Sequence, residues 1–285
     1  MASRRLALLL DNIKFAHTIF ALPFAYCGML LAADGLPTLS QFLWITVAMA
    51  GARTLAMSAN RLIDREIDAR NRRTSGRPLV TGAVRSGEVW ALMGVSLAIY
   101  LAAAASLNRL TLLLAPAALV FLIGYSYTKR FTWASHWVLG ITDGAAAAGG
   151  WIAVTGRFEP GTWLLWAIVA VWIAGFDVVY ACQDVEFDRR EGLQSVPARF
   201  GVARALTVAR VCHLLTALGL LALGLLEGMC WPYWMAWAGT SALLVHENRL
   251  VRPDDLSRLG VAFFNMNGYI AVLVLVGVLL SVYLC

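Results

Sequence analysis

The stretch Asn60-Arg-Leu-Ile-Asp64-Arg-Glu-Ile-Asp68 follows directly on a long apolar run, and a basic run that ends at Arg77 follows it. Its amide and its two carboxylates recur every fourth residue, so in a helix they share one face about one turn apart. Oxygen-bearing side chains on one face suit a hard divalent cation, and the arginines behind them suit a phosphorylated ligand. Because polar groups at a membrane edge are costly, we interpret this cluster as functional.

Apolar residues dominate the whole chain. Hydrophobic residues make up 60% of the 285 residues and charged residues only 14%, which is more apolar surface than a soluble domain needs. Runs of about 20 apolar residues cross a bilayer as helices, and nothing alternates with the period of two that a membrane barrel requires. We predict an all-α, polytopic membrane protein whose nine transmembrane helices form one bundle. The predicted spans are residues 14–33, 39–59, 87–107, 110–127, 136–155, 162–181, 205–226, 229–245 and 260–283.

The basic residues predict the orientation of the chain. If the N-terminus is cytoplasmic, all but two of the 23 lysines and arginines, Arg109 and Arg157, fall on the cytoplasmic side. This distribution obeys the positive-inside rule and predicts an integral protein of a bacterial-type inner membrane. The net charge of +6 then faces anionic lipid or a phosphorylated substrate, not nucleic acid. We expect the long polar loops on this side to carry the chemistry.

The opening stretch has an echo later in the chain. Ala181-Cys-Gln-Asp184-Val-Glu-Phe-Asp188 follows the sixth predicted span as the first motif follows the second span, and a basic, turn-prone tail follows each copy. Two similar halves around a common site are a frequent plan of membrane proteins. We therefore predict a single transmembrane domain, residues 1–285, with halves of about 1–135 and 136–285, and both Asp-rich motifs facing a central cavity.

Two carboxylate pairs indicate a metal–diphosphate site. Mg²⁺ keeps several waters and takes only one or two carboxylates from each protein element, so two facing pairs could hold several ions with a diphosphate between them. Arginine and lysine would bind the outward oxygens of the diphosphate. The structural alternative is a set of interfacial ion pairs, such as Asp64 with Arg65 or Asp68 with Arg72, but it does not account for the duplication.

Two charged residues lie deeper in the predicted spans. Asp177 is seven residues before Asp184, so it shares that helix face about 10 Å deeper in the membrane. Arg53 is its basic counterpart, seven residues before Asn60. An intramembrane charge is either paired or part of a site. Arg53 either forms a salt bridge within the bundle or binds an anionic group of a substrate.

Basic and aromatic residues near the inner membrane edge are further candidates. Tyr125-Ser-Tyr127-Thr-Lys129-Arg130 ends the fourth span. Such residues are ordinarily anchors and topology signals, but Lys129 could reach a phosphate and the rings could face a developing cation. Lys14 and His17 open the first span; we expect Lys14 to touch the site and leave His17 open. The four histidines give no metal-ligand pattern, and the five scattered cysteines are interpreted as apolar fillers.

These motifs together resemble the UbiA superfamily of intramembrane prenyltransferases, over essentially the whole chain. The resemblance rests on Asn60-x-x-x-Asp64-x-x-x-Asp68, on Asn71-Arg-Arg-Thr-Ser-Gly-Arg-Pro78, and on Tyr180-Ala-Cys-Gln-Asp184-x-x-x-Asp188-Arg-x-x-Gly192-Leu-x-Ser195-x-Pro197. Within the superfamily the chain is most similar to the 4-hydroxybenzoate polyprenyltransferases. Its opening, Ile13-Lys-Phe-Ala-His17-Thr-Ile-Phe-Ala-Leu-Pro23-Phe, also resembles the group proposed to act in the futalosine route to menaquinone.

The resemblance implies a role for each motif residue. The Mg²⁺ ligands would be Asn60, Asp64, Asp68, Asp184 and Asp188. The groups that bind the diphosphate would be Arg73, Arg77 and Lys129, to which we add Lys14. The acceptor would be bound by Arg53, with Asn60 nearby. The residues around the reacting carbons would be Tyr125, Asp177 and Tyr180.

The implied reaction is Mg²⁺-dependent transfer of a polyprenyl group from its diphosphate to an aromatic acid, 4-hydroxybenzoate or a hydroxynaphthoate, in ubiquinone or menaquinone biosynthesis. The base that takes the ring proton would be Asp177 or the released diphosphate. The partners would be these two substrates and the lipid bilayer, with no nucleic acid. One alternative is another acceptor, such as a haem, a chlorin or a glycerol phosphate lipid. A second is a secondary transporter of an anionic solute, although transporters usually place such charges near the midplane.

Overall fold

The computed structural model describes residues 8–9, 11–13, 21–33 and 35–285, and these residues form helices and no strand. The predicted all-α fold is therefore confirmed for this part of the chain. The helices are α2 Leu22–Ala33, α3 Leu39–Ile63, α4 Arg65–Arg70, α5 Ser86–Leu107, α6 Arg109–Thr128, α7 Ser135–Thr155, α8 Pro160–Ala181, η2 Cys182–Asp184, α9 Val185–Glu191, α10 Val196–Phe200, α11 Val202–Leu226, α12 Trp231–Leu250, η3 Val261–Met266 and α13 Asn267–Leu284.

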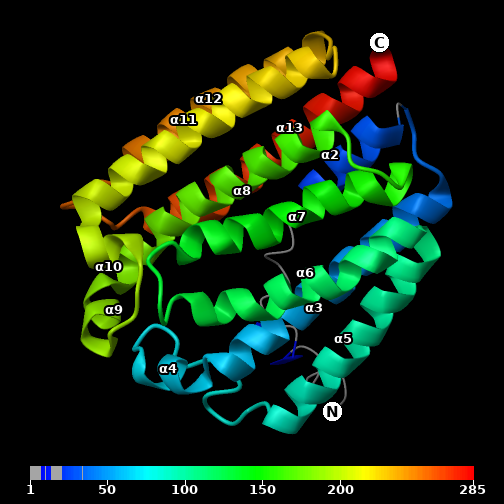
Figure 1. The fold of residues 1–285 in the computed structure, drawn as a ribbon. Coiled ribbons are helices and arrows are strands. Elements are labelled where there is room, and N and C mark those ends of the chain that lie inside the picture. Colours follow the sequence, from blue (N-terminus) through cyan, green and yellow to red (C-terminus); the bar gives the residue numbers. More distant parts are fainter. Residues whose placement is uncertain (1–7, 10, 14–20, 34) are drawn as a thin grey trace.

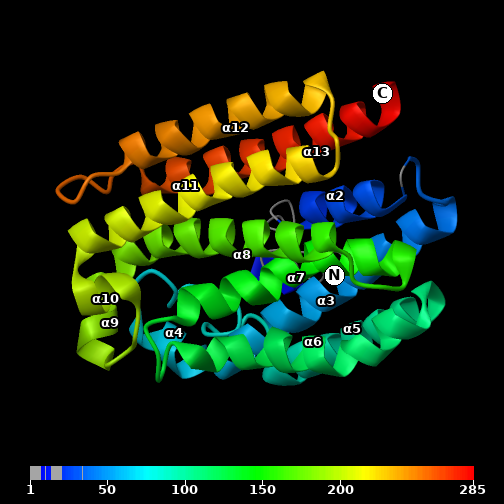
Figure 2. The same ribbon diagram turned by 45° about the horizontal axis from the view of Figure 1, so that its top comes forward.

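The long helices lie roughly side by side, and the short helices α4, α9 and α10 gather at one end of the bundle (Figures 1 and 2). We call this the charged end. At the opposite end lie the turn between α11 and α12 and the last turn of α13. A disulfide joins Cys230 to Cys285 there, so we call it the disulfide end. Because the long helices alternate in direction, both Asp-rich motifs reach the charged end.

Seven helices of the described residues are long and apolar enough to cross a membrane: α3, α5, α6, α7, α8 with its continuation to Glu191, α11, and η3 with α13. Nine spans were expected. The shortfall concerns α2, of which 12 apolar residues are described, and α12, which does not meet the same hydropathy criterion. Polar side chains such as Glu247, Asn248 and Arg249 in the last turns of α12 explain its lower hydropathy.

The two motifs share a local shape. α3 ends at Ile63, and α4 begins at Arg65 after Asp64, which caps both helices. The Asp64 N–H still donates to the Asn60 carbonyl at 2.9 Å, and the Asp68 N–H donates to the Asp64 carbonyl at 2.8 Å. The second motif passes from α8 through the 3₁₀ turn η2 into α9. Since the i, i+4 bonds persist in the first motif, its polar side chains keep the shared face expected from their spacing.

Helix α7 packs in backbone contact with its neighbours. A Cβ atom on Gly28 of α2 would lie 2.1 Å from the Ala147 carbonyl oxygen, and one on Gly150 would lie 2.0 Å from that of Ala25. A Cβ on Gly140 would similarly lie 2.1 Å from a carbonyl oxygen of α8. Only glycine allows helices to approach this closely, as is common between membrane helices. α7 is thereby held between α2 and α8.

An aromatic cluster completes the core beside α7. Trp172 of α8 is fully buried, and its ring lies 4.9 Å from that of Phe24 and 5.0 Å from that of Phe176. Phe176 in turn meets Phe263 of η3 at 5.4 Å. These contacts join α2, α8 and the last helices of the chain around one buried centre.

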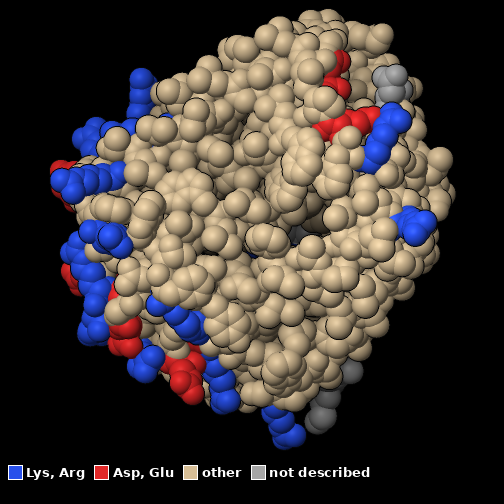
Figure 3. All heavy atoms as spheres, viewed as in Figure 1, with Lys and Arg blue, Asp and Glu red and all other residues tan. Residues whose placement is uncertain are grey.

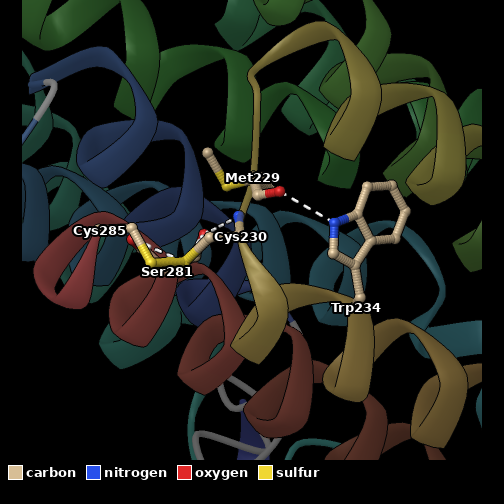
Figure 4. Close-up of a disulfide and its surroundings, with 5 residues drawn as sticks. All are labelled: Met229, Cys230, Trp234, Ser281 and Cys285. Carbon is tan, nitrogen blue, oxygen red and sulfur yellow. Dashed lines mark hydrogen bonds between the residues drawn. A yellow bond between two sulfur atoms is a disulfide. The ribbon is translucent and has the colours of Figure 1, made fainter.

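The interpretation of the cysteines was wrong for two of the five. Cys230 and Cys285 form a disulfide at the disulfide end, where α13 runs antiparallel to α12 and brings its last turn beside the first turn of α12 (Figure 4). Ser281 Oγ also accepts from the Cys230 N–H at 2.8 Å. The two cysteines are 55 residues apart, so only the tertiary fold reveals the pairing. The other three cysteines are buried free thiols.

Candidate active site

A polar cavity of about 260 Å³ lies at the charged end, and residues of both Asp-rich motifs line it. The chain folds so that the end of α3 and the end of α8 face each other across this space, with the end of α6 between them. Eleven of the predicted site residues line the cavity together: Asn60, Asp64, Asp68, Arg73, Arg77, Tyr125, Lys129, Asp177, Tyr180, Asp184 and Asp188.

Asp64 is the most heavily bonded acid of the first motif. Its Oδ2 accepts from Lys129 Nζ at 2.6 Å and from Asn60 Nδ2 at 3.0 Å, and its Oδ1 accepts from Arg130 at 3.1 Å. Asp64 is only 2% exposed. The ion pairs therefore join this motif to the end of α6, and not to the adjacent Arg65 that the structural alternative suggested.

Asp68 pairs within its own loop. Its Oδ2 accepts a hydrogen bond from Arg77, which closes the basic run back onto the motif. The Thr74 hydroxyl donates to the Asp68 carbonyl at 3.0 Å and fixes the same turn. Arg77, and not Arg72, is thus the cation that neutralises Asp68.

Asp184 of the second motif is bound by the loop of the first. Its two oxygens accept from Arg73 Nε at 3.1 Å and from Arg73 Nη2 at 2.6 Å, a bidentate pair. Asn71 Nδ2 also donates to Asp184 at 3.0 Å. Planar two-bond pairing of this kind is the arrangement in which arginine recognises carboxylates and phosphates. The two halves of the chain are joined here.

Arg73 also contacts the ring of Tyr180. Its Nη1 donates to the Tyr180 hydroxyl at 3.0 Å, and its guanidinium carbon lies 5.2 Å from the ring centroid. Burial by itself would lower the pKa of Arg73, but the hydrogen bond to Asp184 and the charges of Tyr180 and Asp184 together raise it. Arg73 therefore keeps its positive charge in this partly buried position.

Asp188 is held by a hydroxyl group. Ser195 Oγ donates to Asp188 Oδ2 at 2.8 Å and caps α10 by accepting from the Ala198 N–H at 3.2 Å. Gly192, at φ +70, ends α9 in the left-handed conformation and turns the chain back toward the cavity. The Gln194 N–H then donates to the Lys129 carbonyl at 2.6 Å. This loop closes one side of the cavity.

The donor atoms around the cavity fit a hard divalent cation. Five acidic and three basic side chains line it, and the acids offer only oxygen ligands. Among the described residues, no group of three or more His, Cys, Asp or Glu side chains is arranged to hold a metal ion, and basic side chains pair with three of the aspartates. Mg²⁺ needs only one or two carboxylates from each element, with water and phosphate oxygens completing its shell. The residues present therefore fit Mg²⁺ bound together with a phosphorylated ligand.

Asp177 lines the inner part of the cavity and has a partner that the sequence analysis did not identify. His136, at the start of α7, lies with Nδ1 2.7 Å from Asp177 Oδ2. Its Nε2 accepts from the Val196 N–H at 3.2 Å. Asp177 is thus both paired and part of the site.

Arg53 lies apart from the eleven residues above. It lines a second, apolar cavity of about 230 Å³ formed mainly by α3, α5, α6 and α7, and the molecular surface is hollowed between α6 and α7 (Figure 3). Arg53 Nη1 lies 3.4 Å from Asp143 Oδ2 of α7. Arg53 Nε is buried and has no hydrogen-bond partner among the described residues.

Two predicted residues lie outside the described residues, and two functional candidates were missed. Lys14 and His17 belong to the first group. The missed residues are His136 and Asp143, both on α7. A signal for Asp143 was present, because a lone carboxylate within an apolar span is a functional candidate by default. His136 lies seven residues before Asp143, the spacing that also separates Arg53 from Asn60.

Comparison with known proteins decides the family. The model of the UbiA prenyltransferase family matches residues 21–283. The chain belongs to the UbiA prenyltransferase family. It is 34% identical over 252 residues to a 4-hydroxybenzoate octaprenyltransferase of Aeromonas salmonicida, and the aligned region covers 88% of this chain and 86% of that protein. A 4-hydroxybenzoate octaprenyltransferase of Nitrosospira multiformis is 31% identical over 255 residues, 89% of this chain and 87% of the other.

Solved structures of the UbiA family share the fold. An apo UbiA homologue from Aeropyrum pernix K1 superposes with a TM-score of 0.85 at 35% identity, covering 93% of this chain and 98% of that chain. A UbiA homologue from Archaeoglobus fulgidus, bound to DMAPP and Mg²⁺, superposes with a TM-score of 0.69 at 21% identity, over 93% and 98% of the two chains. The second likeness concerns the fold alone. Family membership makes this protein a prenyltransferase of the membrane and decides against the transporter.

Proposed function

We propose that this UbiA-family chain transfers a polyprenyl group from its diphosphate to an aromatic acid, in a reaction that requires Mg²⁺. The observation that carries the proposal is the polar cavity, where both Asp-rich motifs meet the basic side chains of two loops. Because similar proteins are named 4-hydroxybenzoate octaprenyltransferase, the first acceptor to test is 4-hydroxybenzoate, in ubiquinone biosynthesis. A hydroxynaphthoate, in menaquinone biosynthesis, is the second.

The ion pairs of the cavity suggest how the donor binds. Arg73, Arg77 and Lys129 each donate to an aspartate that we propose as a metal-binding residue. A diphosphate carrying Mg²⁺ presents anionic oxygens to the basic groups and a cation to the carboxylates. Each basic side chain therefore exchanges an aspartate for an anionic oxygen of the ligand, and each carboxylate exchanges a basic side chain for the metal cation. No charge is left unpaired. We include Lys14 among the groups that bind the diphosphate.

The residues that would hold Mg²⁺ are Asn60, Asp64, Asp68, Asp184 and Asp188. When bound, the metal neutralises charge on the leaving diphosphate. The protein contributes preorganisation: Asn60 donates to both Asp64 and Ser126, and Ser195 holds Asp188, so two of the carboxylates have fixed orientations. Oriented groups of this kind lower the cost of reorganisation when charge develops.

The acceptor and the isoprenoid tail are proposed to use the apolar cavity. Arg53 would bind the carboxylate of the aromatic acid, and Asn60, about two turns farther along α3 in the polar cavity, is our second proposed acceptor-binding residue. Its contact with Asp143 is long, at 3.4 Å, and its Nε has no described partner, so the guanidinium retains hydrogen-bonding capacity for a ligand. The remaining lining is almost entirely apolar, which suits a prenyl chain.

Three residues would act on the reacting carbons. As the allylic C–O bond breaks, the bonding pair leaves with the diphosphate, and the rings of Tyr125 and Tyr180 stabilise the allylic cation. The acceptor carbon beside the hydroxyl then forms the new C–C bond. Asp177 accepts the proton of that carbon, and the C–H pair restores the aromatic ring. Water must be kept out of this space, because it would quench the cation.

We also propose the orientation and extent of the domain. The N-terminus and the charged end would face the cytoplasm of a bacterial-type cell, and nine helices in two related halves would form one transmembrane domain, residues 1–285. The disulfide supports this orientation, because disulfides persist in oxidising compartments and Cys230–Cys285 lies opposite the charged end.

The test uses membranes that contain the chain, a labelled polyprenyl diphosphate, Mg²⁺ and a panel of acceptors. The panel holds 4-hydroxybenzoate, a hydroxynaphthoate, a haem, a chlorin and a glycerol phosphate. We expect a prenylated aromatic acid, identified by mass, and no product when a chelator removes the divalent cation. Membranes that lack the chain are the control. Turnover of a haem, a chlorin or a glycerol phosphate alone contradicts the proposed acceptor class.

The role of Arg53 has its own test. Arg53→Ala should raise the KM of the aromatic acid much more than the KM of the donor, because only the acceptor carries the ring carboxylate. Asp143→Asn, which leaves Arg53 in place, is the matched variant. Equal increases in both KM values after Arg53→Ala contradict the role.

A further inference from the structure

We propose that His136 is a positioning residue that orients the Asp177 carboxylate for proton removal. The inference rests on the proposed function and extends it to a residue on a different helix. His136 is 3% exposed, and its Nδ1 lies 2.7 Å from Asp177 Oδ2. Both side chains line the polar cavity that holds the two Asp-rich motifs.

The hydrogen bonds of His136 fix its tautomer. A backbone N–H can only donate, so His136 Nε2, which lies 3.2 Å from the Val196 nitrogen, must be the unprotonated acceptor. The proton of the neutral ring is then on Nδ1, directed at Asp177. The bonds run in one direction, from the Val196 N–H to the imidazole and from the imidazole to the carboxylate. This leaves the histidine unable to act as the base itself.

The consequence for Asp177 is a fixed carboxylate plane. One oxygen, Oδ2, is engaged by a buried imidazole on the neighbouring helix α7. The other oxygen, Oδ1, is then the one that can meet the substrate. In the proposed step the ring C–H bond breaks, its electron pair returns to the ring, and the proton forms a new O–H bond at Asp177. A carboxylate held at one oxygen does not have to find this orientation at each turnover.

The same hydrogen bonds tie the base to the loop that holds Asp188. Val196 follows Ser195 directly, and Ser195 donates to Asp188 at 2.8 Å. His136 therefore has two separable connections, one to Asp177 and one to the loop. Two substitutions can separate them. An asparagine amide ends near the Nδ1 position and can donate to Asp177, whereas a glutamine amide reaches the Nε2 position and can accept from Val196.

The experiment measures kcat and both KM values in membranes that contain the full chain, with saturating Mg²⁺. If His136 orients Asp177, His136→Gln lowers kcat by roughly 10- to 100-fold, as loss of an orienting partner commonly does, with both KM values preserved. His136→Asn, which restores the donor, recovers most of the rate. His246→Gln, an exposed histidine on α12, is the control and leaves the kinetics unaltered.

A double substitution tests whether His136 acts through Asp177. Once Asp177→Asn has removed the base, adding His136→Gln should change kcat by less than about twofold, because coupled residues are not additive. The inference is overturned if the two effects add, if His136→Asn is as slow as His136→Gln, or if His136→Gln raises the KM values in place of lowering kcat. Absence of any prenylated aromatic acid with the unaltered chain overturns the proposed function and this inference together; product from the unaltered chain at a kcat that His136→Gln does not change overturns this inference alone.

Discussion

The two ends of the bundle are stabilised by different kinds of interaction. At the charged end, Asp64, Asp68 and Asp184 are held by lysine and arginine side chains, and charged residues gather over α4, α9 and α10 (Figure 3). At the disulfide end, the covalent Cys230–Cys285 bond joins the beginning of α12 to the end of α13. Ligand charges can replace an ion pair, whereas no ligand can replace the covalent bond. The end that we propose to bind and release charged substrates is thus the one built from exchangeable contacts.

The largest expected effect is at Asp184, where the two halves meet. Asp184→Asn should lower kcat/KM by about 10³-fold or more, the scale on which loss of a preorganised electrostatic group acts. Arg73 would keep only part of its bidentate partner, and one proposed metal-binding carboxylate would be lost. A prenyl-transfer assay checks this.

Glu186→Gln is the matched control for that substitution. Glu186 is also acidic and lies two residues away, but it is exposed and does not line the cavity. Equal losses in the two variants would mean that the charge of the whole loop, and not the cavity, determines activity.

Removal of the disulfide should lower stability and leave activity intact. Cys230→Ser should lower the free energy of unfolding by roughly 2–4 kcal/mol, since a cross-link over a loop of this length restricts the unfolded chain. Thermal unfolding in detergent, with and without reductant, measures the change. Cys285→Ser and the double variant should match Cys230→Ser, because all three remove the same bond. Loss of turnover at a temperature where the variant remains folded would break the contrast between the two ends.

Removal of the hydroxyl that holds Asp188 should have a smaller effect, confined to the charged end. Ser195→Ala should raise the half-saturating Mg²⁺ concentration about tenfold, because partners that orient a metal-binding carboxylate commonly contribute this much. Ser195→Thr keeps the hydroxyl and serves as the control. A titration of activity with Mg²⁺ distinguishes them, and identical titrations would remove Ser195 from the site.

The smallest effect is expected for an exposed ion pair near the disulfide end. Arg157 Nε lies 2.6 Å from Glu159 Oε1, but the Arg157 side chain is 74% exposed. Arg157→Ala should change the free energy of unfolding by less than about 1 kcal/mol, as is usual for exposed pairs. Thermal unfolding measures it. A loss comparable to that of Cys230→Ser would show that ion pairs also stabilise this end.

The helices could be predicted from the sequence because the bilayer fixes the length of a span. The predicted ranges 39–59, 87–107 and 136–155 fall within a few residues of α3, α5 and α7. The Asp-rich motifs could be recognised for a similar reason, since spacing alone puts the residues of one motif on one helix face. The duplication then indicated that both motifs serve one site, although the distances between them could not be derived from the sequence.

Contacts between helices could not be predicted in the same way. The Cys230–Cys285 bond joins residues 55 positions apart, and neither cysteine lies in a pattern. His136 meets Asp177 across 41 positions, and Arg53 meets Asp143 across 90. Each pair requires the packing of particular helices, which the periodicity of a single helix does not contain. The pairing of Lys129 with Asp64 depends likewise on α6 ending beside α3.

The glycines of α7 have a consequence for the distances in the site. Gly140 and Gly150 meet the backbones of α8 and α2, where any Cβ would collide with a carbonyl oxygen, so α7 has one permitted depth in the bundle. A slip of one residue would move the helix about 1.5 Å along its axis, farther than a hydrogen bond tolerates. These glycines therefore fix the position of α7 along its own axis. The height of His136 beside Asp177 is therefore set partly by contacts up to four helical turns away.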